Sequence, residues 1–95
     1  MSGTIGTKQW LWLHKEDNVA MALSDFAAGA ALSIEGNSVT LKDAVEYGHK
    51  FSLVAIPKGE DVIKYSETIG VASRDIAAGE HVHVHNVQSL RAKRQ

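Results

Sequence analysis

Three histidines alternate with two valines near the C-terminus, where His81, His83 and His85 are separated by Val82 and Val84. On a β-strand, successive side chains point to opposite faces, so the histidines would share one face and the valines would enter the core. Neutral imidazoles two residues apart on a strand can bind one ion of zinc, iron or manganese. No nearby carboxylate pattern completes a facial triad, and a polar strand face that happens to be rich in histidine is the alternative. We expect at least one of these histidines to be functional.

Two other clusters pair a lysine with a hydrogen-bonding side chain. In one, Lys50 could hold a carboxylate while the adjacent His49 donates a hydrogen bond or transfers a proton. In the other, Lys64 could bind an anion and Tyr65 could donate a hydrogen bond to it. Exposed polar residues without a function are the alternative, and spacing alone favours it for both clusters. His14 is an isolated histidine before a turn-forming Asp-Asn pair and is weak evidence by itself.

Length and composition exclude several classes of protein. The 95 residues fit one small domain with a thin core, for which docking onto a partner chain would add stability. A net charge of −1 argues against a nucleic-acid-binding protein. The absence of cysteine excludes disulfides, thiolate metal sites and cysteine nucleophiles. No apolar run has the length of a membrane span and the N-terminus lacks a signal-peptide pattern, so we expect a cytoplasmic protein.

The apolar runs that would position these side chains are short. Runs of about five residues bounded by glycine and acidic residues are typical of strands, which predicts an all-β domain with little helix. The predicted strands cover residues 10–14, 19–23, 51–56 and 81–85. One helix is predicted over residues 38–47, from the spacing of Leu41, Ala44 and Val45 and from Gly48 as its stop.

A weak repeat links the predicted strands. Three segments share an apolar residue, two turn residues, a glycine, and another apolar residue three positions later. Glycine tolerates a positive φ angle and suits the last turn position before a new strand. The unequal spacing of the glycines excludes a solenoid and predicts a small irregular β-domain. The three turns are Ala27-Ala28-Gly29, Pro57-Lys58-Gly59 and Ala77-Ala78-Gly79.

Taken together and in order, these motifs resemble the SAF domain of altronate and galactarate dehydratases, and also the small subunit of sulfolactate sulfo-lyase. The resemblance runs from residue 13 to residue 87. One departure is Ser66, at a position where the family commonly has glycine. The motifs are Leu13-His14, Asp17-Asn18-Val19-Ala20, Gly48-His49-Lys50, Val62-Ile63-Lys64-Tyr65, Ile69-Gly70 and the stretch from Asp75 to Asn86.

The resemblance implies a β-clip fold and an elimination reaction on a small hydroxy acid. In that reaction a base removes the proton next to a carboxylate, a β-leaving group departs, and the enol becomes a 2-keto acid. The leaving group is hydroxide in the dehydratases and sulfite in the sulfo-lyase. The family implies a divalent metal, Fe²⁺ or Mn²⁺, and a large catalytic subunit or domain as partner.

We therefore expect a SAF domain over residues 10–88, between a flexible N-terminus at 1–9 and a basic tail at 89–95. The expected function is the small subunit or N-terminal domain of a hydro-lyase that dehydrates a sugar acid. The alternatives are the small subunit of a sulfolactate-type sulfo-lyase and a non-catalytic binding or assembly module. His83 and His85 are the expected catalytic residues and the expected metal ligands. The expected substrate-binding residues are His14, His49, Lys50, Lys64, Tyr65 and Asn86.

Overall fold

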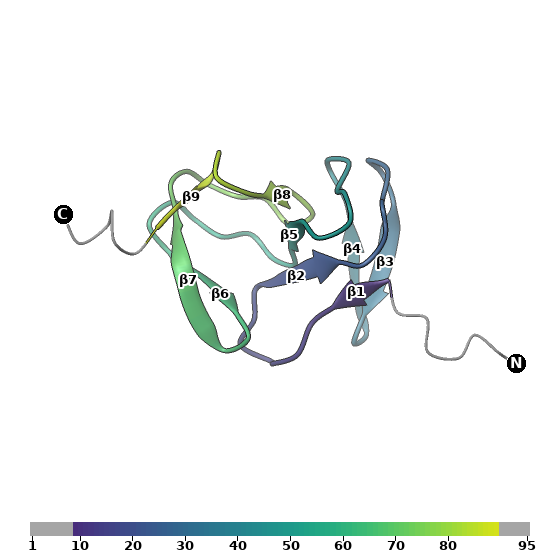
Figure 1. Ribbon diagram of the computed structural model, residues 1–95, viewed down its shortest axis with the longest axis horizontal. Helices are drawn as coiled ribbons and strands as arrows, with labels where there is room; N and C mark the ends of the chain where they lie inside the picture. The colour runs from purple at the N-terminus through teal and green to yellow at the C-terminus, as the bar shows by residue number, and fades with distance from the viewer. Residues whose placement is uncertain (1–8, 90–95) are drawn as a thin grey trace, which may run out of the picture.

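A computed structural model describes residues 9–89, which form nine short strands and no helix (Figure 1). This confirms the predicted all-β class. The expected N-terminal segment and basic tail fall largely on residues 1–8 and 90–95, outside the described residues. No described helix is long and apolar enough to cross a membrane. The strands are β1 (Trp10–Leu11), β2 (Val19–Ala22), β3 (Ala31–Ile34), β4 (Asn37–Thr40), β5 (Lys50–Ser52), β6 (Asp61–Lys64), β7 (Glu67–Ala72), β8 (His81–Val82) and β9 (Val87–Gln88).

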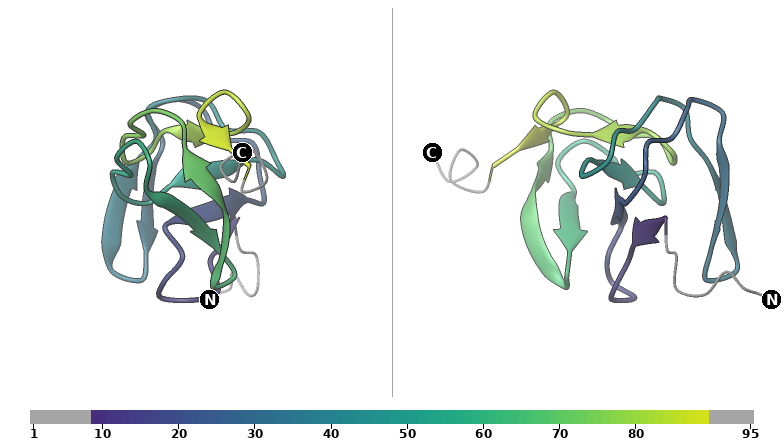
Figure 2. Two further views of the ribbon diagram at one scale, coloured as in Figure 1. Left: turned by 90° about the vertical axis from the view of Figure 1, so that its left-hand side faces the viewer. Right: turned by 45° about the vertical axis from the view of Figure 1, so that its right-hand side comes forward.

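The strands form three antiparallel sheets. A central four-stranded sheet has the order β1-β2-β5-β8, and it lies between the β3-β4 hairpin and the three-stranded β6-β7-β9 sheet (Figures 1 and 2). Strands β2 and β5 are the inner pair, in which Ala20 lies opposite Phe51. Strand β8 pairs with the outer side of β5 and forms one edge of the central sheet.

The chain between β2 and β8 is an internal duplication. The segment β2-β3-β4 and its closing turn, residues 19–48, is followed by an equivalent β5-β6-β7 segment and turn at residues 50–79. Equivalent backbone contacts recur: the bridge between Phe26 and Val45 in the first repeat corresponds to the one between Ile56 and Ile76 in the second. All three predicted turns are present, and their glycines have φ angles of 85° to 92°. A fourth turn of the same kind ends at Gly48, which completes two turns for each repeat.

The predicted helix over residues 38–47 is wrong. Its first residues belong to β4, and the remainder is a β-bridge and a turn. The helical spacing of Leu41, Ala44 and Val45 is incidental, because Ala44 is exposed while Leu41 and Val45 are buried. Strand alternation from Val39 to Leu41 explains the buried positions instead.

Each repeat builds its own hydrophobic core, and the central sheet separates the two. Val19 faces the second core, whereas its neighbour Ala20 faces the first, as strand alternation requires. Trp10 and Trp12 pack at the margin of the first core. The first core consists of Ala20, Ala22, Leu32, Ile34, Val39, Leu41, Val45 and Phe51; the second consists of Val19, Ile56, Val62, Ala72, Ile76 and Val82.

Candidate functional site

Pairing between β5 and β8 brings together histidines that are far apart in the sequence. Phe51 lies opposite His81, and Lys50 lies opposite Val82. Extending this antiparallel register by one residue sets His49 opposite His83, so that His49, His81 and His83 share one face of the sheet edge.

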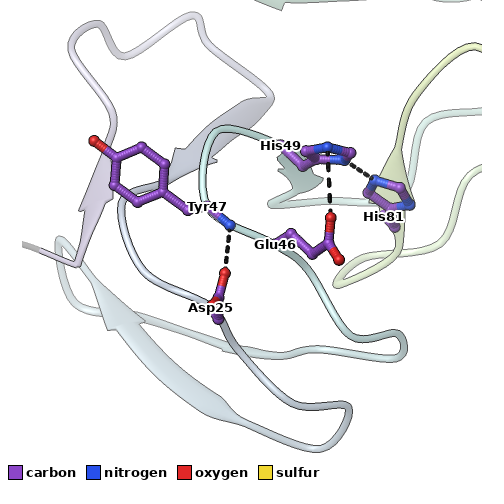
Figure 3. A network of polar contacts seen from close by, with 5 residues as sticks. All are labelled: Asp25, Glu46, Tyr47, His49 and His81. Atoms are coloured by element: carbon purple, nitrogen blue, oxygen red, sulfur yellow. Dashed lines mark hydrogen bonds and ion pairs between the residues drawn. The ribbon is translucent and has the colours of Figure 1, made fainter.

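The three imidazole rings stack on one another. The ring centroid of His49 lies 5.1 Å from that of His81 and 4.9 Å from that of His83, and the interplanar angles are below 30°. Nδ1 of His49 and Nε2 of His81 are 2.9 Å apart, so one of these nitrogens donates a hydrogen bond to the other (Figure 3). The ring of His85 lies 5.4 Å from that of His81 and completes a group of four histidines.

Neighbouring carboxylates hold this group in place. Oε1 of Glu46 lies 4.0 Å from Nε2 of His49, whereas the other ring nitrogen, Nδ1, contacts His81 (Figure 3). Asp25 accepts a hydrogen bond from the backbone N–H of Tyr47 and so fixes the turn that leads to His49. The backbone N–H of His81 donates to Oδ2 of Asp43 at 3.1 Å.

The environment of His81 favours the neutral ring. Burial, followed by repulsion from the three histidines around it, holds the pKa of His81 below its ordinary value of 6.5. The nearby carboxylate of Asp43 acts in the opposite direction and raises this pKa. A neutral imidazole can accept a hydrogen bond or bind a metal ion, so His81 is suited to either role.

The expected strand over residues 81–85 ends at Val82, so the second valine, Val84, lies outside the strand. Val82 is fully buried as predicted, but Val84 is 81% exposed, and the expectation that it enters the core is wrong. Residues 83–86 form a turn because Oδ1 of Asn86 accepts the backbone N–H of His83. The strand alternation therefore breaks after His83.

Asn86, expected to contact substrate, is fully buried. Its Nδ2 donates to the carbonyl oxygen of His81 at 2.8 Å and to Oε2 of Glu80 at 3.4 Å. Both ends of the amide are thus used within the protein, beneath the turn that carries His83 and His85.

Lys50 lies on the other face of β5 from the histidines. It lines a surface hollow of about 300 Å³ together with Ile69, Val82, His83 and Val84 among other residues. Burial, and then the positive charge of Lys64, lowers the pKa of Lys50 below 10.5. His83 connects the two features, since it belongs to the histidine group and also lines the hollow.

The remaining predicted residues lie elsewhere. His14 is in the exposed β1-β2 loop, beside the opposite edge of the central sheet from β8. That loop contacts the β6-β7 turn, where the backbone N–H of Ser66 donates to Asp17. Tyr65 is in the same turn, with Nζ of Lys64 3.9 Å from its ring centroid. The predicted set therefore divides between the β8 edge and the β6-β7 turn.

The structure also brings together three histidines that could hold a metal ion, of which one, His83, belongs to the expected pair. His49, His81 and His83 each offer a ring nitrogen, and these nitrogens lie within 4.8 Å of one another. Imidazole nitrogens suit zinc and iron, so the donor set fits the iron that the family resemblance implies. Sequence reasoning did not single out Glu46, and it did not choose His81 as a ligand. The sequence did not reveal the pairing of β5 with β8, which places His49 beside His81, with Glu46 next to His49.

Comparison with known proteins gives the same assignment over almost the whole chain. Residues 8–90 match the profile of the altronate/galactarate dehydratase SAF domain. The chain is 51% identical to altronate dehydratase of Escherichia coli strain K12 over 81 residues, which are 85% of this chain and 16% of that protein. It is 49% identical to (2R)-sulfolactate sulfo-lyase subunit alpha of Chromohalobacter salexigens over 51 residues, 54% of each chain. It is also 32% identical to galactarate dehydratase (L-threo-forming) of E. coli K12 over 76 residues, 14% of that protein. The chain therefore spans less than a fifth of the dehydratases that it matches.

Proposed function

This chain belongs to the altronate/galactarate dehydratase SAF-domain family, and from that membership we propose that it is the SAF part of a hydro-lyase that dehydrates a sugar acid. The observation that carries the proposal is the 51% identity to an altronate dehydratase over 85% of this chain. The matched region is only 16% of that relative, so we propose that a large catalytic chain or domain completes the enzyme. The same proposal places the enzyme in the cytoplasm, without a nucleic-acid or membrane partner.

In the proposed reaction the histidine group faces the substrate at the junction with the large partner. His83 and His85 are exposed and can exchange protons with a bound molecule, which suits acid-base steps in an elimination. A divalent iron or manganese ion, when bound, would be chelated by the oxygens of the acid and would stabilise the negative charge that develops on the acid.

The anionic end of the substrate calls for a cation nearby. Lys64 is close enough to Lys50 for its positive charge to lower the pKa of Lys50, after the larger effect of burial, and a carboxylate placed between the two lysines would relieve this repulsion. We propose that the hollow beside Lys50 receives the carboxylate end, with His49 and His83 close to it. His14 and Tyr65 are proposed to contact the substrate only if the partner carries it towards the β6-β7 turn.

The proposal is tested by co-expressing this chain with a large catalytic chain of the same family and assaying a panel of aldonates, aldarates and sulfolactate. We expect dehydration of an aldonate or aldarate by the assembled enzyme and little or no turnover by the isolated chain. Robust turnover by the isolated chain would refute the proposal that a large catalytic chain or domain is needed to complete the enzyme. Assembly without turnover of any of these acids would favour a non-catalytic binding module.

His85→Ala tests the catalytic role of the exposed histidines. We expect turnover by the assembled enzyme to fall by about a hundredfold, the scale of a lost acid-base group, with an unchanged melting temperature. Lys58→Gln, a change to an exposed side chain in the turn before β6, is the control. Near-normal turnover and assembly for both His83→Ala and His85→Ala would remove the catalytic assignment.

A sulfo-lyase is the second candidate. The observation in its favour is that the matching sulfo-lyase protein is itself a separate subunit, of which this chain covers 54%. Release of sulfite from sulfolactate in the same panel, without dehydration of sugar acids, would select this function over the first.

A further inference from the structure

We propose that His49, His81 and His83 form a binding site for one divalent metal ion of the iron, manganese and zinc class. The site deepens the proposed function and depends on it only for the part that the ion would take in the reaction. Binding of the ion itself is a property of this chain.

The first argument is convergence. Three imidazoles from two strands place one nitrogen each within a sphere small enough that all three lie within 4.8 Å of one another. Metal–nitrogen bonds of about 2.0–2.1 Å require any two ligand nitrogens to lie at most about 4.2 Å apart. The stacked rings must therefore turn about their side-chain bonds until the three nitrogens point at one ion. The hydrogen-bonded nitrogens of His49 and His81, 2.9 Å apart, are within this limit, and an ion would take the place of the proton that they share.

The second argument is the carboxylate behind His49. One nitrogen of this ring faces His81, and the other faces Glu46 at 4.0 Å. Histidine ligands of metals commonly donate the second ring N–H to a carboxylate, which fixes the tautomer and makes the ligating nitrogen more basic. Glu46 is therefore a positioning residue, and its exposed side chain is free to turn towards His49.

The third argument is the open side of the site. His83 is exposed, whereas His49 and His81 are half-buried. The protein would therefore bind the ion on the side that faces the sheet, and the coordination positions on the solvent side would stay open. Three protein ligands with an open position are the arrangement of metal sites that bind a substrate, in contrast to closed structural sites. His85 lies beside His81 but outside the converging set, and we assign it no bond to the ion.

The test is isothermal titration of the metal-free 95-residue chain with Zn²⁺, followed by Mn²⁺ and by Fe²⁺ under anaerobic conditions. We expect one ion per chain, and chemical-shift changes at the ring nitrogens of His49, His81 and His83 in ¹⁵N spectra with Zn²⁺. His83→Ala, at an exposed position that does not threaten folding, should weaken binding at least about tenfold, and His49→Ala and His81→Gln should do the same. Glu46→Gln should weaken binding while leaving the stoichiometry at one.

His14→Ala and His85→Ala are the matched controls and should change the affinity for the ion by less than about twofold. Loss of a residue that only orients a ligand typically weakens metal binding by about tenfold or more, so a twofold change would show that neither histidine takes part. Loss of binding in His85→Ala comparable to that in His83→Ala would overturn the ligand set. Absence of binding, or binding that survives both His83→Ala and His49→Ala, would overturn the site. Because no lyase assay is involved, failure of this test leaves the proposed dehydration to be judged by turnover alone.

Discussion

The buried amide of Asn86 shapes the turn that carries the exposed histidines. Its oxygen accepts the backbone N–H of His83, and its nitrogen donates to the carbonyl of His81. A buried polar side chain with several partners is costly to remove, because the groups that it satisfied lose their hydrogen bonds away from water. Asn86 thus fixes the position of the turn that carries the histidines, and its own side chain does not contact solvent.

Asn86→Ala is expected to lower the free energy of unfolding by about 2–4 kcal/mol, through lost hydrogen bonds and the cavity left behind. Urea denaturation of the isolated chain measures the change. Gln88→Ala, which removes an exposed amide from β9, is the matched control and should change stability little. If Asn86 contacted substrate instead, the variant would raise KM in the assembled enzyme and leave the unfolding curve unchanged.

Lys50 provides a second prediction at the residue scale. Burial and the charge of Lys64 disfavour its protonated form, so its pKa in the folded chain lies below 10.5. Between the lowered pKa of Lys50 in the folded chain and its ordinary pKa of 10.5 in the unfolded chain, the folded chain binds fewer protons than the unfolded chain. The free energy of unfolding therefore rises as the pH increases through this window. Lys64→Gln should shift the Lys50 pKa upwards, as measured by the titration of its side-chain resonances. Lys58→Gln should not, because Lys64 is the charged group that influences Lys50.

The two repeats use the same hairpin with different turn residues. In β3-β4 the two-residue turn is Glu35-Gly36, and in β6-β7 it is Tyr65-Ser66, and all four residues have positive φ angles. Turns of this kind favour glycine or asparagine, because a β-carbon is strained at positive φ. Ser66 has a φ of 63°, and its backbone N–H donates to Asp17. The departure from glycine at Ser66 therefore leaves the turn geometry intact but strained.

Ser66→Gly is expected to raise the free energy of unfolding by about 0.5–1 kcal/mol, since relief of left-handed strain exceeds the added freedom of the unfolded chain. Thermal denaturation of the isolated chain is a sufficient measurement. Ser66→Ala separates the causes, because it removes the hydroxyl contact with Glu16 but keeps the β-carbon. A glycine variant less stable than the alanine variant would show that strain at this position is not the dominant effect.

At the scale of the whole molecule, two small cores share one central sheet. Strand β2 gives Val19 to the second core and Ala20 to the first, so neither core can be lost without disturbing the strand that supports the other. Phe51 is fully buried in the first core, on the strand that begins the second repeat. This sharing of strands predicts that the two repeats unfold together.

We expect denaturation followed by tryptophan fluorescence, which reports on the first core, to have the same midpoint as loss of the amide signals of Val62 and Val71 in the second repeat. Phe51→Ala should destabilise both probes equally, by about 3–5 kcal/mol for a large aromatic side chain removed from a core. Val54→Ala, at a half-exposed position, is the control and should have a small effect. Separate midpoints for the two probes would show that the repeats are independent folding units.

The sequence alone determined the all-β class, the three glycine turns and the family, because turn chemistry and ordered motifs are local properties of the chain. Local spacing also misled: residues 38–47 have a helix-like pattern, and that prediction concealed the fourth turn at Gly48 and with it the duplication. Only the tertiary structure revealed the histidine group, because the pairing of β5 with β8 brings His49 to His81 across 32 positions of sequence. It also decided the burial of Val84 and Asn86, since a hydrogen bond from His83 to the Asn86 side chain shapes the turn after Val82, in which Val84 is exposed and Asn86 is buried.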